Sequence, residues 1–209
     1  MKTTTKPKRG RPRTAPRTAM VERTTAETQI RARLRLDGKG RYQVTTGIRF
    51  LDHMLELFAH HSGFGLEVRA TGDLDVGGHH TVEDIGLCLG QALREALGEK
   101  RGIRRFGFFL LPMDEALVEV AVDLSGRPYF AHNFELSGLR VGDFDAELTS
   151  HFFQSLVNEA ALTLHIRLVA GGDTHHIVEA VFKGVARALG MACEHRGRGD
   201  DVPSTKGVL

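Results

Sequence analysis

The chain has 209 residues, of which 41% are hydrophobic and 26% charged, and its net charge is +2. This length and composition exclude a disordered protein and allow one or two globular units with a buried core. Cys88 and Cys193 are too few and too far apart for a disulfide scaffold or a CxxC site, so we expect a reducing compartment, the cytoplasm. No apolar run approaches the roughly 20 residues that cross a bilayer, and we expect a soluble protein.

Residues 1–20 are predicted to form a disordered basic leader, because they carry seven Lys and Arg residues and no acid. The run Arg9-Gly10-Arg11-Pro12 resembles an AT-hook, a segment that can lie in the minor groove of DNA. One four-residue match in a basic tail is weak evidence. A solvated arm without a specific partner is the favoured interpretation, and a nucleic-acid partner is not expected.

The first half of the remaining chain predicts a strand, a helix, a strand and a helix. Apolar residues alternate over 28–36 and Asp37-Gly38 follows, which indicates a strand that turns into a hairpin. Apolar residues at helical spacing predict helices over 49–61 and 80–97, each followed by a glycine, and 66–70 alternates as a strand does.

The second half repeats this order. Strands are predicted over 107–123, 129–136 and 164–168. Helices are predicted over 147–162 and 175–189, the latter ending at Gly190.

An internal repeat of roughly 95 residues is too long for a solenoid unit. HHTVEDIG at 79–86 aligns with HHIVEAVF at 175–182, and His53 aligns with His151. We interpret 21–209 as one domain of two pseudo-repeats, at about 22–100 and 101–190, followed by a C-terminal tail. The predicted fold class is α+β: each half is an antiparallel sheet with two helices on one face, and the halves pack helix against helix.

Two segments carry adjacent histidines followed by a glutamate, at positions that share one face of a helix. Adjacent helical residues diverge by about 100°, so each histidine pair is suited to serve two metal ions. Six imidazoles and two carboxylates divide into two sites of three His and one Glu. The predicted ligands are His53, His79, His80, Glu83, His151, His175, His176 and Glu179.

Four ligands on a metal that prefers six leave positions for substrate and water, as in a catalytic site. The alternative is a pair of polar helix starts, but two such motifs at matching places favour metal binding. These donors suit Mn, Fe, Co, Ni and Zn, so the residues leave the metal open. Of the other histidines, His61 is predicted to contact substrate. The rest are interpreted as surface or packed residues: His60, His132, His165 and His195.

Basic residues predict a phosphate site, because phosphate is bound by fixed Arg and Lys donors with hydroxyl and backbone N–H groups. The candidates include Arg104, Arg105, Arg127, Lys183 and the tail 203–207. A glycine-containing run at 196–199 precedes this tail, which suggests a segment that closes over the bound substrate.

Six motifs in order resemble imidazoleglycerol-phosphate dehydratase of histidine biosynthesis, over about 22–209. They are LDHML at 51–55, HHTVED at 79–84, MDEA at 113–116, DLSGRP at 123–128, HHIVEAVFK at 175–183 and PSTKG at 203–207.

The resemblance implies a duplicated, ribosomal protein S5 domain 2-like fold with the helices between two sheets. It implies two Mn²⁺ per active site, with other divalent transition metals as alternatives, and a small phosphorylated imidazole as substrate. It also implies an octahedral homo-oligomer with active sites at subunit interfaces. The implied substrate and phosphate contacts are Glu27, His61, Arg105, Arg127, Lys183, Ser204, Thr205 and Lys206.

The implied reaction is a dehydration, which a metal-dependent hydro-lyase performs. Binding of the substrate imidazole to metal would favour expulsion of the hydroxyl and make a carbon-bound proton acidic. Glu27 is the predicted acid/base, with Asp114 as a second candidate.

The chain departs from the family at Gly77-Gly78, where an acidic residue is common, and at Asp173, where Asn is usual. These departures put the support of the ligating histidines in doubt. Two rival functions remain from the residues: a DNA-binding protein with a structural metal core, and a metal-dependent phosphate-ester hydrolase.

Overall fold

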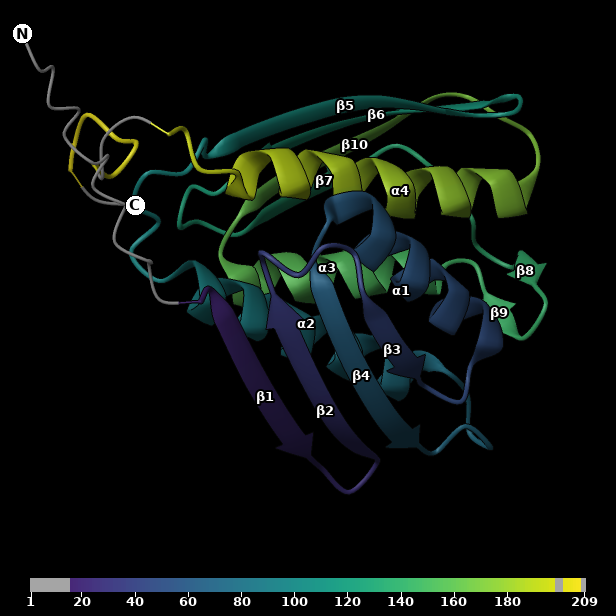
Figure 1. The fold of residues 1–209 in the computed structure, drawn as a ribbon. Helices are drawn as coiled ribbons and strands as arrows, with labels where there is room; N and C mark the ends of the chain where they lie inside the picture. Colours follow the sequence, from purple (N-terminus) through teal and green to yellow (C-terminus); the bar gives the residue numbers. More distant parts are fainter. Residues whose placement is uncertain (1–15, 198–200, 208–209) are drawn as a thin grey trace, which may run out of the picture.

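The structure is a computed structural model that describes residues 16–197 and 201–207. Within these residues, two four-stranded sheets enclose four helices, so the molecule is layered sheet, helices, helices, sheet (Figure 1). This confirms the α+β class and the helix-to-helix packing of the two halves. The AT-hook-like run at 9–12 lies outside the described residues.

The first half contributes one sheet, in the order β1-β2-β4-β3, and two helices. The strands are β1 (Thr18–Thr24), β2 (Thr28–Arg35), β3 (Tyr42–Thr45) and β4 (Gly65–Gly72). The helices are α1 (Arg49–Ser62) and α2 (His79–Leu97). In β2, Thr28, Ile30, Ala32 and Leu34 are buried while the residues between them are not, as expected where one face of a sheet meets the core.

The second half contributes a sheet of the same order, β5-β6-β10-β7. The strands are β5 (Phe106–Met113), β6 (Ala116–Asp123), β7 (Tyr129–His132) and β10 (Thr163–Ala170), and the helices are α3 (Leu148–Ala160) and α4 (Thr174–Cys193). A short hairpin of β8 (Arg140–Val141) and β9 (Phe144–Asp145) has no counterpart in the first half of the described chain. Its Asp143 accepts hydrogen bonds from the backbone N–H groups of Arg49 and Phe50 and so caps α1.

Four details differ from the sequence-based expectation. β1 begins at Thr18, inside the range 1–20 assigned to the leader, and it pairs with β2. The hairpin predicted at Asp37-Gly38 was wrong, because β3 runs parallel to β4 instead of pairing with β2. The corresponding β7 is parallel to β10, so both sheets are mixed at one edge. α4 continues through Gly190 to Cys193.

The strand registers show which residues of the two halves correspond. Thr18 lies opposite Arg35 in the first sheet, and Phe106 lies opposite Asp123 in the second. Leu36 N–H donates to the carbonyl of Arg17, as Leu124 N–H donates to that of Arg105. Arg17 and Arg105 are therefore equivalent positions in the duplicated fold.

Glycines bring α2 and α3 into close contact. A methyl group on Gly86 would lie 2.6 Å from the carbonyl oxygen of Phe152, and one on Gly90 would lie 2.4 Å from that of Leu156. These residues are spaced i, i+4, so they form one face of α2. The small side chains thus allow the central helices to pack backbone to backbone.

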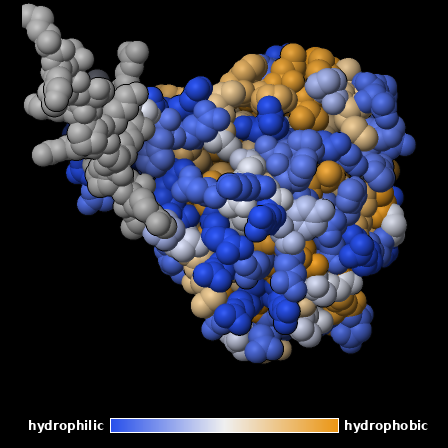
Figure 2. All heavy atoms as spheres, viewed as in Figure 1, coloured by the Kyte–Doolittle hydropathy of each residue, from blue (hydrophilic) through white to orange (hydrophobic). Residues whose placement is uncertain are grey.

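Both cysteines are buried and free. Among the described residues, no helix combines the length and the apolar character that a membrane crossing needs. The face seen in Figure 2 is mostly hydrophilic, with hydrophobic residues gathered at its upper edge, on the side of the second sheet. On β5, the side chains of Phe106, Phe108 and Leu110 are exposed.

Candidate active site

The first histidine motif lies at the start of α2. The helix places Glu83 one turn after His79, and their Nε2 and Oε2 atoms are 3.7 Å apart. His151, in the first turn of α3, contributes the third side chain, because its ring centroid is 4.8 Å from that of His79. This trio brings together three of the predicted ligands.

The second motif forms the matching trio at the start of α4. His175 Nε2 lies 3.1 Å from Glu179 Oε2, and His53 Nε2, from α1, lies 3.9 Å from the same oxygen. Asp173 caps α4, because its side chain accepts a hydrogen bond from the N–H of His176. The residue that departs from the family pattern therefore stabilises the helix that carries the motif.

The second histidine of each motif points toward a carboxylate outside its own trio. His80 Nδ1 is 2.9 Å from Asp73, and His176 Nδ1 is 2.7 Å from Glu115. Each contact raises the pKa of the histidine, and the hydrogen bond to the carboxylate is the largest cause. A hydrogen bond at Nδ1 fixes the orientation of the ring and leaves the lone pair of Nε2 available to bind a metal ion.

Asp73 and Glu115 were missed by sequence reasoning, because they lie in turns where no periodicity marks them. Glu115 also accepts hydrogen bonds from the N–H groups of Asp173 and Gly172. The hydrogen bond from Asp173, followed by that from His176, lowers the pKa of Glu115 to about 2. The sequence signal is only that MDEA places a second carboxylate directly after Asp114.

The two predicted acid/base residues lie beside the free Nε2 atoms of these histidines. Glu27 Oε1 is 3.8 Å from Nε2 of His80, and Asp114 Oδ2 is 3.5 Å from Nε2 of His176. Glu27 follows β1 and Asp114 follows β5, so each carboxylate comes from the first hairpin turn of its half. Asp114 adopts a φ of 50° there.

Within residues 16–197 and 201–207, no three His, Cys, Asp or Glu side chains are arranged to hold an ion by themselves. The chemistry of the donors nevertheless fits a divalent transition metal, because each trio offers imidazole nitrogens and a carboxylate oxygen. The Nε2 atoms of His80 and His176 lie near Glu27 and Asp114, which belong to neither trio. A single chain thus provides two partial sets of metal ligands, the trios, and two further potential ligands, His80 and His176.

Lys183 lies beside the second trio, where its ammonium forms an ion pair with Glu179. Burial acts to raise the pKa of Glu179, but the hydrogen bond and charge of Lys183 lower it. The neighbouring His61 has a lowered pKa, first because it is partly buried and second because Lys183 is close. Neither residue lines the cavity that holds the other predicted phosphate contacts.

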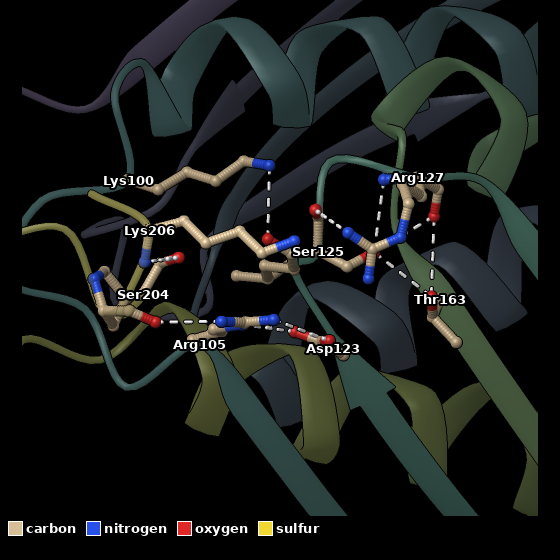
Figure 3. A network of polar contacts seen from close by, with 10 residues as sticks. Lys100, Arg105, Asp123, Ser125, Arg127, Thr163, Ser204 and Lys206 are labelled. Atoms are coloured by element: carbon tan, nitrogen blue, oxygen red, sulfur yellow. Dashed lines mark hydrogen bonds and ion pairs between the residues drawn. The ribbon is translucent and has the colours of Figure 1, made fainter. Parts of the chain in front are cut away.

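That cavity has a volume of about 560 Å³ and lies where β5 begins and the C-terminal tail returns to the domain. Its basic lining comes from Arg105, Arg127, Arg196 and Lys206, and Ser204 and Thr205 add hydroxyl groups. Figure 3 shows Arg105, Asp123 and Ser204 on one side and Ser125, Arg127 and Thr163 on the other. Five of the predicted phosphate contacts are thereby brought together.

The two arginines differ in their partners. Arg105 donates from Nε and Nη2 to both oxygens of Asp123, at 2.7 and 3.1 Å, and from Nη1 to the carbonyl of Pro203 at 2.9 Å. Among the described residues, the guanidinium of Arg127 has one hydrogen bond, from Nη1 to the carbonyl of Ser125 at 3.4 Å. Arg105 therefore holds the tail in place, while the guanidinium of Arg127 keeps donors for a ligand.

The trios and the cavity lie at opposite ends of the helical layers. His175 is the second residue of α4, whereas Arg105 N–H donates to the carbonyl of Ala192 near the end of that helix. At 1.5 Å per residue, roughly 25 Å separates them. A small substrate cannot reach both within one chain.

Comparison with known proteins supports one family. The family model described as imidazoleglycerol-phosphate dehydratase matches residues 46–189. The protein of that name from Citrifermentans bemidjiense is 55% identical over 193 residues, which cover 92% of this chain and 99% of the relative. The chloroplastic imidazoleglycerol-phosphate dehydratase 1 of Arabidopsis thaliana is 54% identical over 190 residues, which cover 90% of this chain and 70% of the relative.

Solved structures agree with this result. The crystal structure of imidazoleglycerol-phosphate dehydratase from Staphylococcus aureus superposes with a TM-score of 0.77 at 44% identity and covers 85% of this chain and 99% of that one. The enzyme from Pyrococcus furiosus gives 0.78 at 42% identity and covers 90% of this chain and 100% of that one. The chain belongs to the imidazoleglycerol-phosphate dehydratase family.

Proposed function

We propose that the protein dehydrates D-erythro-imidazole glycerol phosphate to imidazole acetol phosphate in histidine biosynthesis, in active sites shared between subunits. The observation that carries this proposal is the separation of the two His-His-Glu trios from the phosphate-type cavity by one helix length. The family relationship supplies the reaction, and the separation supports the proposal that a second chain completes each site.

The two trios are the proposed centres of a dinuclear manganese site, with other divalent transition metals as alternatives. His53, His175 and Glu179 would hold one ion, and His79, Glu83 and His151 the other. His80 and His176 would each supply the fourth ligand to a site of a neighbouring subunit. Bound divalent ions would act as Lewis acids toward the substrate imidazole.

The chain's own side chains then perform the proton transfers and the positioning. Loss of water breaks a carbon–oxygen bond and removes a carbon-bound proton, and the resulting enol becomes the ketone without a change in oxidation state. Glu27 is the proposed acid/base, because its carboxylate lies in an exposed turn beside His80. Asp114 occupies the comparable position beside His176 and is the second candidate.

The proposed phosphate contacts are Arg105, Arg127, Ser204, Thr205 and Lys206, all of which line the cavity. Lys183 and His61 are proposed to act at the metal end instead, because Lys183 pairs with Glu179. Closing of the tail over the bound phosphate would exclude water from the reacting carbon atoms.

The proposed partner is a second copy of this chain, in an octahedral homo-oligomer that works in the cytoplasm. Exposed Phe106, Phe108 and Leu110 alternate along β5 and form an apolar row, which is the kind of surface that subunit contacts bury. Neither a nucleic acid nor a membrane is expected as a partner.

The test is a dehydratase assay on purified protein combined with metal analysis. Wild-type protein reconstituted with Mn²⁺ should produce the phosphorylated ketone and bind two ions per chain. Glu27→Gln should lose at least about a hundredfold in kcat, as general acid–base catalysis contributes 10² to 10⁴, yet retain both ions. Release of inorganic phosphate instead of ketone would favour an ester hydrolase and refute the proposal.

A further inference from the structure

Lys100 is a buried lysine that is not among the residues proposed to bind metal or substrate. Only 8% of the residue is exposed. It follows the end of α2, where its N–H donates to the carbonyl of Leu97 and its φ of 57° turns the chain. Figure 3 shows the side chain extending toward the turn at Ser125, close to the network around Arg105.

The ammonium of Lys100 holds the strand end from which the turn with Arg127 begins. Nζ donates to the carbonyl oxygen of Leu124 at 3.2 Å, and the N–H of Leu124 donates to the carbonyl of Arg105 at 3.1 Å. The next residue, Ser125, accepts a hydrogen bond from the N–H of Arg127 through its hydroxyl oxygen. A chain of contacts thus connects Lys100 to Arg127, the arginine that keeps guanidinium donors for a ligand.

The carboxylates nearby are occupied by other cations. Asp123 accepts two hydrogen bonds from Arg105, and Asp201 pairs with Arg196. Among the described residues, the carbonyl of Leu124 is the one hydrogen-bond acceptor that contacts Nζ of Lys100. Burial lowers the pKa of Lys100, although the charge of Asp123 acts to raise it. Among the described residues, the buried ammonium thus contacts no carboxylate directly, and it lies close to Arg105, which lines the basic cavity.

We propose that Lys100 is a positioning residue of the phosphate site, which fixes the Leu124–Arg127 turn and adds a buried positive charge that a bound phosphate dianion compensates. The inference rests on the proposed phosphate-binding role of this cavity. In the free protein, burial of the Lys100 ammonium reduces the stability of the fold. A bound anion offsets this unfavourable free energy by its attraction to the ammonium. If Lys100 served only the stability of the fold, a neutral substitution would lower stability and leave the affinity for phosphate unchanged.

The experiment measures binding of inorganic phosphate to the full-length protein by calorimetry, and the shift in Tm that phosphate causes. Lys100→Met and Lys100→Gln remove the charge, and the glutamine retains a donor for the Leu124 carbonyl. Lys100→Arg retains the charge. Lys39→Met is the matched control, because Lys39 is also a lysine at positive φ, 61°, but is exposed in the turn after β2.

We expect Lys100→Gln, which keeps a donor for the Leu124 carbonyl, to have a Tm no lower than the wild type without phosphate. Both neutral variants should bind phosphate at least about fivefold more weakly, in line with the loss of one nearby charge. KM for the phosphorylated substrate should rise by the same factor, with little change in kcat. Lys100→Arg and Lys39→Met should bind phosphate as the wild type does.

Unchanged phosphate affinity in the neutral variants would overturn the inference. So would a Lys100→Gln protein that is less stable or does not fold, because the charge would then serve the fold itself. The outcome is separable from the proposed reaction. If wild-type protein binds phosphate in a Lys100-dependent manner but forms no ketone, the reaction is wrong and the role of Lys100 stands.

Discussion

Arg105 and Arg127 line the same cavity, but their hydrogen bonds suit them to different roles. Arg105 has a side chain that is 16% exposed and is held by Asp123 and by the carbonyl of Pro203. The hydrogen bond to Asp123 also raises the pKa of Arg105, so the guanidinium stays charged. Arg127 has no carboxylate partner among the described residues, and its charge is available to a ligand.

Replacement of Arg127 by alanine should therefore lower kcat/KM by about tenfold or more, which corresponds to roughly 1.4 kcal/mol for each factor of ten. The physical reason is the loss of a charge-assisted hydrogen bond to the substrate phosphate. Steady-state kinetics on folded protein is the measurement. Arg104→Ala is the control, because Arg104 is an exposed neighbour of Arg105 that pairs with Glu194. Wild-type kinetics in Arg127→Ala would remove this residue from the site.

At the level of elements, the described residues form this cavity in the second half, and the matching place in the first half is built differently. In the first half, the residue equivalent to Ser125 is Asp37, which directly accepts two hydrogen bonds from Arg17. Gly38 then packs against the backbone of Gly65, where an added methyl group would lie 1.9 Å from the nitrogen. In the second half, Arg105 pairs with Asp123 at the end of β6 instead. The following turn, with Ser125 and Arg127, therefore makes no ion pair with Arg105 and borders the cavity.

The Arg17–Asp37 pair should make stability depend on pH. The hydrogen bond from Arg17 lowers the pKa of Asp37 below its ordinary value of 3.8. A carboxyl whose pKa is lower in the folded state stabilises the fold above the unfolded pKa, and this contribution is lost as the pH falls through the folded pKa. Asp37→Asn should thus have a lower urea midpoint than the wild type at pH 7. Near pH 3 the difference between the two midpoints should be smaller. An equal difference at both pH values would contradict this assignment.

The contact between α2 and α3 leads to a prediction about packing. Gly90→Ala improves helix propensity by about 1 kcal/mol, but its methyl group would meet the Leu156 carbonyl oxygen at 2.4 Å. Overpacking of a core typically destabilises by about 1 to 3 kcal/mol, so a net loss of stability is expected. Denaturant unfolding measures it, with Glu95→Ala on the exposed side of α2 as the control. A more stable Gly90→Ala protein would show that the helices can move apart.

The elements that sequence predicts best here are those with strong local patterns. The helices and β2 were predicted because apolar residues recur with the helical period in the helices and at every second residue in β2. β1 was missed because only Val21 of its seven residues is buried, so no alternation marks it. The parallel pairing of β3 with β4 depends on a contact across α1 and cannot be read from the local residues.

The same reasoning applies to the candidate site. Helical spacing was enough to associate each histidine motif with its glutamate, and the internal repeat added His53 and His151. Asp73, Glu115 and Lys100 could not be found in this way, because they lie in turns and reach their partners only through the tertiary fold. Spacing also could not show that the phosphate-type cavity lies a helix length away from the trios.

At the scale of the whole molecule, the tail connects the chain end to this cavity. The carbonyl of Asp201 accepts a hydrogen bond from Gly102, and residues 202–206 line the cavity wall. A truncation after Asp201 should keep the fold and the bound metals, because 202–207 include no residue of the buried core. It should lose most turnover, because Ser204, Thr205 and Lys206 are removed. Unaltered turnover would show that the tail plays no part in the reaction.

The arrangement of the trios predicts that metal controls assembly. His80 and His176 have their Nε2 atoms beside Glu27 and Asp114, which belong to neither trio, and no three donors among the described residues hold an ion unaided. If these histidines complete sites in neighbouring chains, each bound ion joins two subunits. Stripping the metal with a chelator should then reduce the particle mass measured by light scattering, and Mn²⁺ should restore it.

His176→Ala separates this effect of metal from a general stabilisation of the fold. The variant keeps both trios intact but lacks one of the donors proposed to bridge subunits, so Mn²⁺ should still raise its Tm through the remaining ligands. Its particle mass should stay low even with Mn²⁺ present, because the contact between chains is incomplete. His165→Ala is the matched control, since His165 lies on the outer face of β10 against Tyr129 and belongs to neither trio. An assembly of full size in His176→Ala would mean that the subunits associate without the shared metal, and the apolar row on β5 would then be the surface to test.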